Sequence, residues 1–253
     1  MKKLQNTTNY IWSCSAVGLV LLVWQMICSV GLVESFMLPS PLQVLQAFIS
    51  EFPTLMEHSL ITLTEAFWGL ALGILLGFVM AVIMDQFEPL YKACYPLIIL
   101  TQTIPTVAIA PLLVLWFGYE MAPKVILIVI TTFFPITIGL LNGFRSVDPD
   151  SIHLLRAMGA GRWQIFSHIN LPGALSQFIS GLRISASYAV VGAVISEWLG
   201  GFGGLGVYMT RVKKAFAFDK MFAVIFLISI ISLLLMKAVD FMQKACMPWE
   251  KNE

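Results

Sequence analysis

Six long apolar segments dominate this chain of 253 residues and constrain its fold more than any other feature. A helix of about 20 apolar residues crosses the ~30 Å hydrocarbon layer of a membrane. Lipid offers no partner to an unpaired backbone amide, so such segments are expected to cross as helices. They are residues 11–33, 59–84, 95–117, 122–144, 174–199 and 220–241. The sequence therefore predicts an all-α integral membrane protein with six transmembrane helices.

The composition favours the same class of protein. The chain is 58% hydrophobic and 11% charged, whereas a soluble domain is roughly half apolar and about 25% charged. With a net charge of +1, the chain lacks the excess of basic residues that is typical of nucleic-acid-binding proteins. The histidines and cysteines are too scattered for a metal site or a disulfide framework. We therefore expect no catalytic residue, no metal, no bound cofactor and no nucleic-acid partner.

The connections set the sidedness and the organisation of the chain. The first segment is longer than the core of a signal peptide, about 7–15 residues, so it is expected to be retained. Six spans and the Lys and Arg bias predict both termini in the cytoplasm. We expect a first span with an outer loop (1–58), a core of five spans (59–241) and a tail (242–253). The outer loop is expected to carry a short helix at 43–52, and the core includes a long inner loop at 145–173.

Prolines and glycines predict bends and breaks. Pro105 and Pro111 in the third span and Pro135 in the fourth indicate bent helices, which neighbouring helices tolerate in a membrane. In the inner loop, residues 148–151 form a helix start. The glycines at 159–161 divide the apolar and basic residues that follow into two short helices.

Two sets of polar residues are candidates for a translocation path. Placing an ionisable group inside a membrane costs free energy, so such a group is taken as a candidate for a functional role. Glu65 and Glu197 are the acidic candidates, although Glu197 lies near the outer end of its span and could simply reach water. The third span adds a polar cluster, which could equally hydrogen-bond between helices: Thr101, Gln102, Thr103 and Thr106.

Small residues recur every four positions in two spans. In a membrane, small residues let helix backbones approach closely. We therefore expect tight packing, inside a bundle or across a dimer, along two faces: Gly69, Gly73 and Gly77, and Ser185, Ala189 and Ala193.

Other function classes find less support. Residues 201–206 match the dinucleotide pattern G-x-G-x-x-G, but they follow a membrane span, so they predict a flexible turn. No Gly-Lys-Ser/Thr occurs, so no ATP site is expected. A membrane protease would need a nucleophile and base, and no histidine lies inside a span. An ion-coupled secondary transporter remains a weaker alternative, since the halves show no clear repeat.

The inner loop resembles a known signature. Gly159, nine further residues and Ile169-Asn170-Leu171-Pro172 are similar to the latter half of the EAA loop, E-A-A-x-x-x-G-x(9)-I-x-L-P, of bacterial ABC importer permeases. The first half departs, with His153-Leu154-Leu155 in place of Glu-Ala-Ala. From about residue 38 to 240 the chain resembles permeases of nitrate, sulfonate, taurine and thiamine-pyrimidine-precursor importers. Further matching stretches are LPSP at 38–41, IP at 104–105, APL at 110–112, LWFG at 115–118, GAGRWQIF at 159–166, GLG at 204–206, Lys124, Gly143 and Glu197.

The resemblance implies a type I ABC importer permease-like bundle in a bacterial inner membrane. Its partners would be two ATPase subunits that bind ATP and Mg, a second permease copy in a homodimer, an extracytoplasmic binding protein and membrane lipid. The inner loop would dock on the ATPase as a helix in a groove, with Met158, Trp163 and Phe166 as one apolar patch; a helix on the inner leaflet is the alternative. The implied coupling residues are His153, Leu155, Arg156, Ala157, Met158, Gly159, Ala160, Trp163, Phe166, Ile169, Leu171 and Pro172.

The substrate is the least constrained part of the expectation. EWLGG at 197–201 followed by GLGVYM is most similar to the pyrimidine-precursor branch. The spans also offer little fixed positive charge for a sulfonate or nitrate. A sulfonate, taurine, nitrate or riboflavin-like solute remains an open alternative.

The sidedness predicts the labelling of introduced cysteines. In a background without the native cysteines, a membrane-impermeant thiol reagent added outside should label a cysteine at Ser50 and not one at Ser151, because these residues lie in the outer and inner loops. The reverse pattern would invert the predicted topology.

Overall fold

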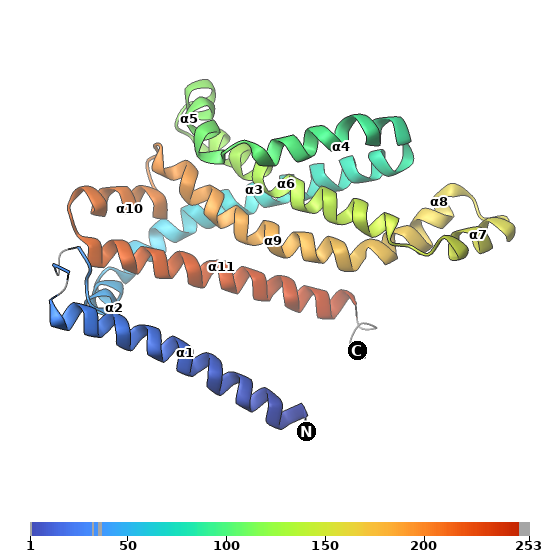
Figure 1. The fold of residues 1–253 in the computed structure, drawn as a ribbon. Coiled ribbons are helices and arrows are strands. Elements are labelled where there is room, and N and C mark those ends of the chain that lie inside the picture. The colour runs from blue at the N-terminus through green and yellow to red at the C-terminus, as the bar shows by residue number, and fades with distance from the viewer. Residues whose placement is uncertain (1, 32, 35–36, 248–253) are drawn as a thin grey trace. The chain divides into compact units, whose positions relative to one another are not determined.

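The computed structural model describes residues 2–31, 33–34 and 37–247, and every regular element within them is helical (Figure 1). The chain forms two compact units, one with the residues up to Glu57 and Tyr208–Leu227, and the other with His58–Val207 and the residues from Ile228 onward. The elements are α1 (Lys2–Val30), α2 (Pro41–Ser50), α3 (Phe52–Gln86), α4 (Glu88–Thr103), α5 (Thr106–Phe117), α6 (Met121–Arg145), α7 (Pro149–Ala157), α8 (Arg162–Ile165), the π-helix η1 (Phe166–Asn170), α9 (Leu171–Trp198), α10 (Leu205–Lys214) and α11 (Phe218–Cys246).

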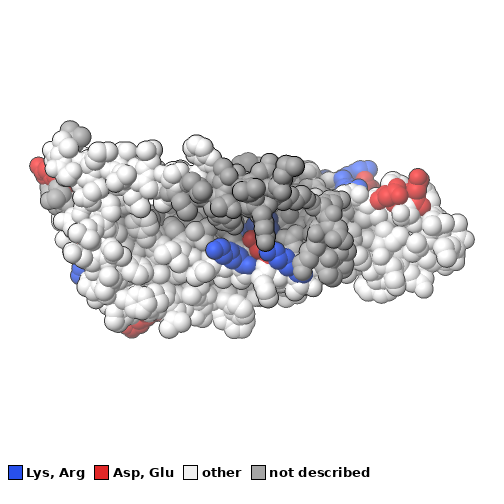
Figure 2. All heavy atoms as spheres, turned by 90° about the horizontal axis from the view of Figure 1, so that it is seen from below, with Lys and Arg blue, Asp and Glu red and all other residues white. Residues whose placement is uncertain are grey.

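The predicted helical membrane fold is confirmed. Four helical segments are long and apolar enough to cross a membrane: α3, α6, the continuous run through α8, η1 and α9, and α11. The pair α4 and α5 passes the same test only together. In α1 the described apolar part covers Ser15–Val30, so the count of six spans stays a prediction. Most of the described surface in Figure 2 carries no charged side chain, as contact with lipid requires.

The predicted third span is broken rather than merely bent. Helix α4 ends at Thr103, α5 begins at Thr106, and their axes differ by 96°. Pro105 has no amide hydrogen to donate, and Ile104 before it takes an extended conformation with φ −82° and ψ 122°. In α6, by contrast, the helix continues through Pro135.

Helix α6 packs against α3 through glycines. Gly69, Gly73 and Gly77 face α6, with almost no space between the two helices. A Cβ on Gly73 would lie 2.1 Å from Oγ1 of Thr132. A Cβ on Gly69 would lie 2.4 Å from an α6 side chain, and one on Gly77 would lie 2.9 Å from another. Larger residues here would push the helices apart, so the small residues set their separation.

Helix α9 packs equally closely on α6, and the two lie side by side in Figure 1. A Cβ on Gly181 would lie 2.4 Å from the Pro135 carbonyl oxygen. The Ser185 hydroxyl donates to the Thr132 carbonyl oxygen at 2.9 Å. The small residues on this face of α9 are all buried: Ser185, Ala189 and Ala193. Helix α6 thus contacts α3 and α9 through small residues on both partners.

A buried ion pair also joins α3 to α6. The Lys124 ammonium donates to Oε1 of Glu65 at 2.5 Å, and the two side chains are only 6% and 5% exposed. Removing one partner of such a pair leaves an uncompensated buried charge, which costs about 3–5 kcal/mol. The pair therefore fixes α3 and α6 to each other.

Glu197 does not reach water, because it is 1% exposed and holds the chain after α9. Its Oε2 accepts the N–H of Gly206 at 2.6 Å, and its Oε1 accepts the Thr62 hydroxyl at 2.8 Å. The Thr62 oxygen accepts the N–H of Leu205 at 2.9 Å. A carboxylate and a hydroxyl thus satisfy amides in the first turn of α10, which would otherwise lack partners.

The glycine-rich segment forms the predicted turn between α9 and α10, but its backbone is held in place. Gly204 has φ +114°, and a Cβ there would lie 2.1 Å from Oε1 of Glu197. Its N–H donates to Nδ1 of His58 at 3.0 Å. The expected flexible turn is therefore a fixed one, because three successive N–H groups bind buried side chains.

The other unit joins α1 and α2 to the beginning of α11. The capping box of Ser40 and Gln43 starts α2, and the Trp24 ring of α1 lies 5.7 Å from the ring of Phe222. Lys220 hydrogen-bonds to Glu51 and holds the pKa of that carboxyl below its usual value.

Loss of the buried ion pair should destabilise the bundle. Lys124→Met leaves the Glu65 carboxylate without its cation, so the midpoint of thermal unfolding in detergent should fall by roughly 6–20 °C. Adding Glu65→Leu should recover much of the loss, because no unpaired charge then remains.

Lys92→Met is the matched control, because Lys92 pairs with Glu88 at 3.6 Å with both side chains exposed. Exposed pairs contribute little. Equal shifts for Lys92→Met and Lys124→Met would contradict the role of the buried pair.

Candidate functional site

The inner loop begins with the helix that the sequence predicts. Asp148 is the N-cap of α7, and its Oδ1 accepts the N–H of Asp150 at 3.1 Å. Pro149 follows at the first helical position, where its missing amide hydrogen is not needed. Side-chain capping and proline together define where α7 starts.

Gly159 ends α7 in a Schellman motif. Its N–H donates to the carbonyl oxygen of Arg156, and the N–H of Ala160 donates to that of Leu155, both at 3.0 Å. This motif requires a left-handed residue, and Gly159 has φ +87°. A Cβ at this position would have no atom within 4 Å. Gly159 is therefore needed for its positive φ and not for the close approach of another backbone.

The second short helix is not separate from the fifth span. Arg162 to Trp198 is one helical run through α8, η1 and α9, so Ile169, Leu171 and Pro172 belong to the base of this span rather than to a loop. Pro172 has no amide hydrogen to donate. The chain before it forms one turn of π-helix, in which the Leu171 N–H donates a hydrogen bond to the Phe166 carbonyl oxygen.

The loop presents apolar side chains to its surroundings. Leu154, Met158 and Trp163 are 62%, 77% and 73% exposed. Phe166 differs from the expected patch, because it is 5% exposed and lies with its ring 5.5 Å from those of Phe144 and Trp163. It anchors the loop to the bundle instead. The other expected loop residues are exposed (His153, Arg156, Ala157, Gly159, Pro172) or half-buried (Leu155, Ala160, Ile169, Leu171).

A polar cavity of about 360 Å³ lies at the base of this loop. Two guanidinium groups, those of Arg156 and Arg162, line it, and neither forms an ion pair within the described part of the chain. The end of α3 provides the opposite wall. The remaining lining residues are Asp85, Gln86, Ile165, Phe166 and Asn170.

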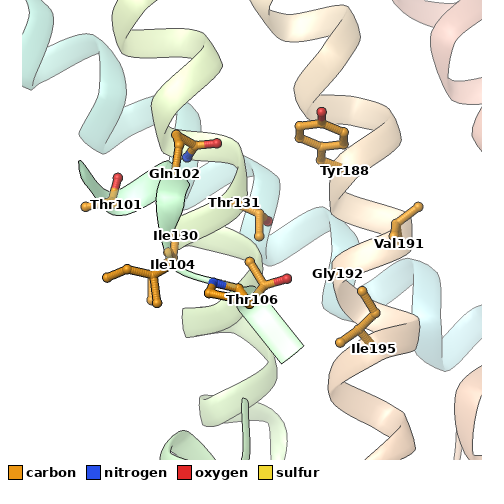
Figure 3. A pocket seen from close by; sticks show the side chains of 11 residues that line it. Thr101, Gln102, Ile104, Thr106, Ile130, Thr131, Tyr188, Val191, Gly192 and Ile195 are labelled. Carbon is orange, nitrogen blue, oxygen red and sulfur yellow. The ribbon is translucent and has the colours of Figure 1, made fainter. Parts of the chain in front are cut away.

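A second cavity, of about 330 Å³, lies at the break between α4 and α5 (Figure 3). Gln102 of α4 and Tyr188 of α9 flank it from two sides, and Thr131 of α6 lies between them in the view. None of its lining residues is charged. They are Thr101, Gln102, Ile104, Pro105, Thr106, Ile130, Thr131, Tyr188, Val191, Gly192 and Ile195.

Several polar groups in this cavity are free to bind a solute. Among the described residues, the Gln102 amide and the hydroxyls of Thr106 and Tyr188 form no hydrogen bond with protein groups. The hydroxyls of Thr101 and Thr131 donate to carbonyl oxygens of their own helices, at 2.6 and 2.8 Å, and keep their lone pairs. The cavity therefore offers both donors and acceptors, without a fixed charge.

The structure separates the predicted path residues. Three of the four polar residues of the third span line the cavity, whereas Thr103 does not. The Thr103 hydroxyl donates to the Leu100 carbonyl oxygen at 2.8 Å. Glu65 and Glu197 are also absent from the lining; they hold helices and the turn after α9. Tyr188 is not among the residues predicted to line a path, although Tyr188, Val191, Gly192 and Ile195 have the spacing of one helix face.

No group of three or more His, Cys, Asp or Glu side chains that could hold a metal ion occurs in the part of the chain that the structure describes.

Comparisons with known proteins agree on one family. A family model described as binding-protein-dependent transport system inner membrane component matches residues 73–251. The chain is 36% identical to a probable ABC transporter permease protein of Haemophilus influenzae, over 89% of this chain and 92% of that protein. It is also 36% identical to the formylaminopyrimidine transport permease protein ThiX of Halalkalibacterium halodurans, over 93% and 94% of the two chains.

Solved structures show the same fold. This chain is similar to a chain in a crystal structure of an amino acid ABC transporter, with a TM-score of 0.66 and 16% sequence identity. The match covers 78% of this chain and 96% of the other. This chain also matches one from the inward-facing MetNI methionine ABC transporter with a TM-score of 0.62 at 21% identity, covering 76% and 94%. These matches confirm the expected type I ABC importer bundle. The chain therefore belongs to the family of binding-protein-dependent transport system inner membrane components, the permease subunits of ABC importers.

Proposed function

We propose that this permease imports a pyrimidine precursor of thiamine, of the formylaminopyrimidine type. The observation that carries the proposal is the 36% identity to a formylaminopyrimidine permease over 93% of this chain. The cavity at the break of the third span supports it, because hydroxyl and amide groups line it without a cation for an anionic solute. Riboflavin and taurine permeases are also similar, at 30% and 29% identity.

The permease works with partners that supply binding and energy. An extracytoplasmic binding protein delivers the solute, and a separate ATPase subunit binds ATP and Mg. In our proposal two copies of this chain form a homodimer with two ATPase subunits, because closed twofold assembly uses one docking loop from each copy. The chain itself hydrolyses no ATP, and its termini lie in the cytoplasm.

The inner loop is proposed to be the coupling element. Leu154, Met158 and Trp163 are exposed apolar side chains of this loop, and in our proposal they enter a groove on the ATPase. The guanidinium groups of Arg156 and Arg162 lie at the neighbouring polar cavity and add charge to the contact. Since Arg162 to Trp198 is one helical run, a displacement of α8 passes directly into α9. Helix α9 in turn lines the cavity, so the loop and the path share one helical run.

The coupling role predicts that the turn at Gly159 is essential. Gly159→Val forces a β-branched residue to φ +87°, at a cost of about 2 kcal/mol. The native turn should then be roughly 30-fold less populated. The variant should insert normally in the membrane, recover several-fold less ATPase subunit on co-purification and lose uptake.

Gly161→Val is the matched control, because Gly161 has φ −74° and a Cβ there would meet only Oε1 of Gln164, at 3.7 Å. It should retain binding and uptake. Full retention of ATPase binding and uptake by Gly159→Val would mean that this loop does not couple the permease to the ATPase.

The proposed substrate predicts a selective uptake. A bacterial strain without its own uptake of the pyrimidine should take up labelled formylaminopyrimidine when it expresses this chain with its ATPase subunit and binding protein. Excess unlabelled taurine or riboflavin should not compete, because the cavity lacks a cation and is small. Uptake of taurine, an alkanesulfonate or riboflavin in place of the pyrimidine would reassign the substrate.

A further inference from the structure

We propose that the cavity at the break of the third span is a solute-binding site of the permease itself, selective for small, neutral, hydrogen-bonding solutes over anions. This inference rests on the proposed function, because it extends that function from import to recognition within the membrane. Its substrate class is an uncharged heteroaromatic amine, such as an aminopyrimidine.

The position of the cavity indicates a solvated path. Non-helical backbone at membrane depth is tolerated only where protein covers it or where it lines a water-filled cavity. Ile104 and Pro105 form such a non-helical break, and both line this cavity. Broken transmembrane helices of this kind commonly form binding sites in transporters.

The exposure of the lining supports the same conclusion. Thr101 and Gln102 are exposed in the single chain, and so is Tyr188, at 47%. Polar groups at this depth are costly against lipid. The open side of the cavity therefore faces a path, which in the proposed homodimer lies between the two copies.

The chemistry of the lining selects the solute class. The Gln102 amide both donates and accepts, and the Thr106 and Tyr188 hydroxyls do the same. An aminopyrimidine ring alternates acceptor nitrogens with amine donors at its edge, so it can pair with such groups. Its flat faces can pack on the aliphatic lining, which Ile104, Ile130 and others provide.

The same lining disfavours anions. A sulfonate or nitrate that leaves water for this cavity would lose its hydration without meeting a cation, and burial of an uncompensated charge is costly. The buried cation of α6, Lys124, already binds Glu65 and does not line the cavity. Selection by charge thus follows from what the cavity contains.

The volume of the cavity accommodates a small solute. Ligand pockets span about 300–1,000 Å³, and this cavity, at about 330 Å³, lies at the lower end. A single small ring fits within this volume.

The test measures binding to the purified permease–ATPase complex without the binding protein. Labelled formylaminopyrimidine should bind, and a labelled alkanesulfonate of similar size should not. Gln102→Leu and Tyr188→Phe each remove free hydrogen-bonding groups with little change in shape, so each should weaken binding by roughly five- to tenfold. Binding is expressed per assembled complex, so a lower yield does not imitate weaker binding.

Thr103→Val is the matched control, because Thr103 lies next to Gln102 but does not line the cavity. It should bind the pyrimidine like the parent. If the parent complex imports the pyrimidine in cells but Gln102→Leu and Tyr188→Phe bind it unchanged, the inference is wrong and the proposed function stands. If the parent imports an alkanesulfonate and no pyrimidine, the proposed function fails, and the inference fails with it.

Discussion

The packing of α6 between α3 and α9 is the constraint on which the remaining features depend. Apolar surface gives helices no drive to associate in lipid, so this contact relies on close backbone approach, hydroxyl hydrogen bonds and one buried ion pair. Gly73 and Gly181 leave no space for a side chain, and Ser185 and Lys124 add directed polar contacts. With α6 held in this way, the polar cavity beside it has walls of defined position.

One helical run connects the inner loop with the cavity at the break of the third span. In our proposal the exposed side chains of α7 and α8 lie outside the membrane, whereas the cavity lies beside the break of α4 and α5. The continuous run from Arg162 to Trp198 connects them, and Phe166, packed on Phe144, anchors its beginning in the bundle. In our proposal this run carries the displacement from the ATPase to the solute path.

Much of this arrangement can be predicted from local sequence. Apolar length predicts the helices, Asp148 and Gly159 predict the ends of α7, and Pro105 predicts a disturbance in the third span, because each of these effects acts within a few residues. Contacts between distant segments escape such reasoning. Nothing local shows that Lys124 meets Glu65, that Glu197 caps α10, or that Tyr188 joins the cavity. Phe166 was expected at the exposed patch for the same reason, since periodicity does not show which face another helix covers.

The central claim, that the loop around Gly159 couples this permease to an ATPase, is tested most directly by site-specific photo-crosslinking. A photoreactive phenylalanine analogue at Trp163 should cross-link to the ATPase subunit in membranes. The same analogue at Leu115 of α5 should not, although Leu115 is 79% exposed and Trp163 is 73% exposed. No cross-link from Trp163, in a complex that transports its substrate, would contradict the account.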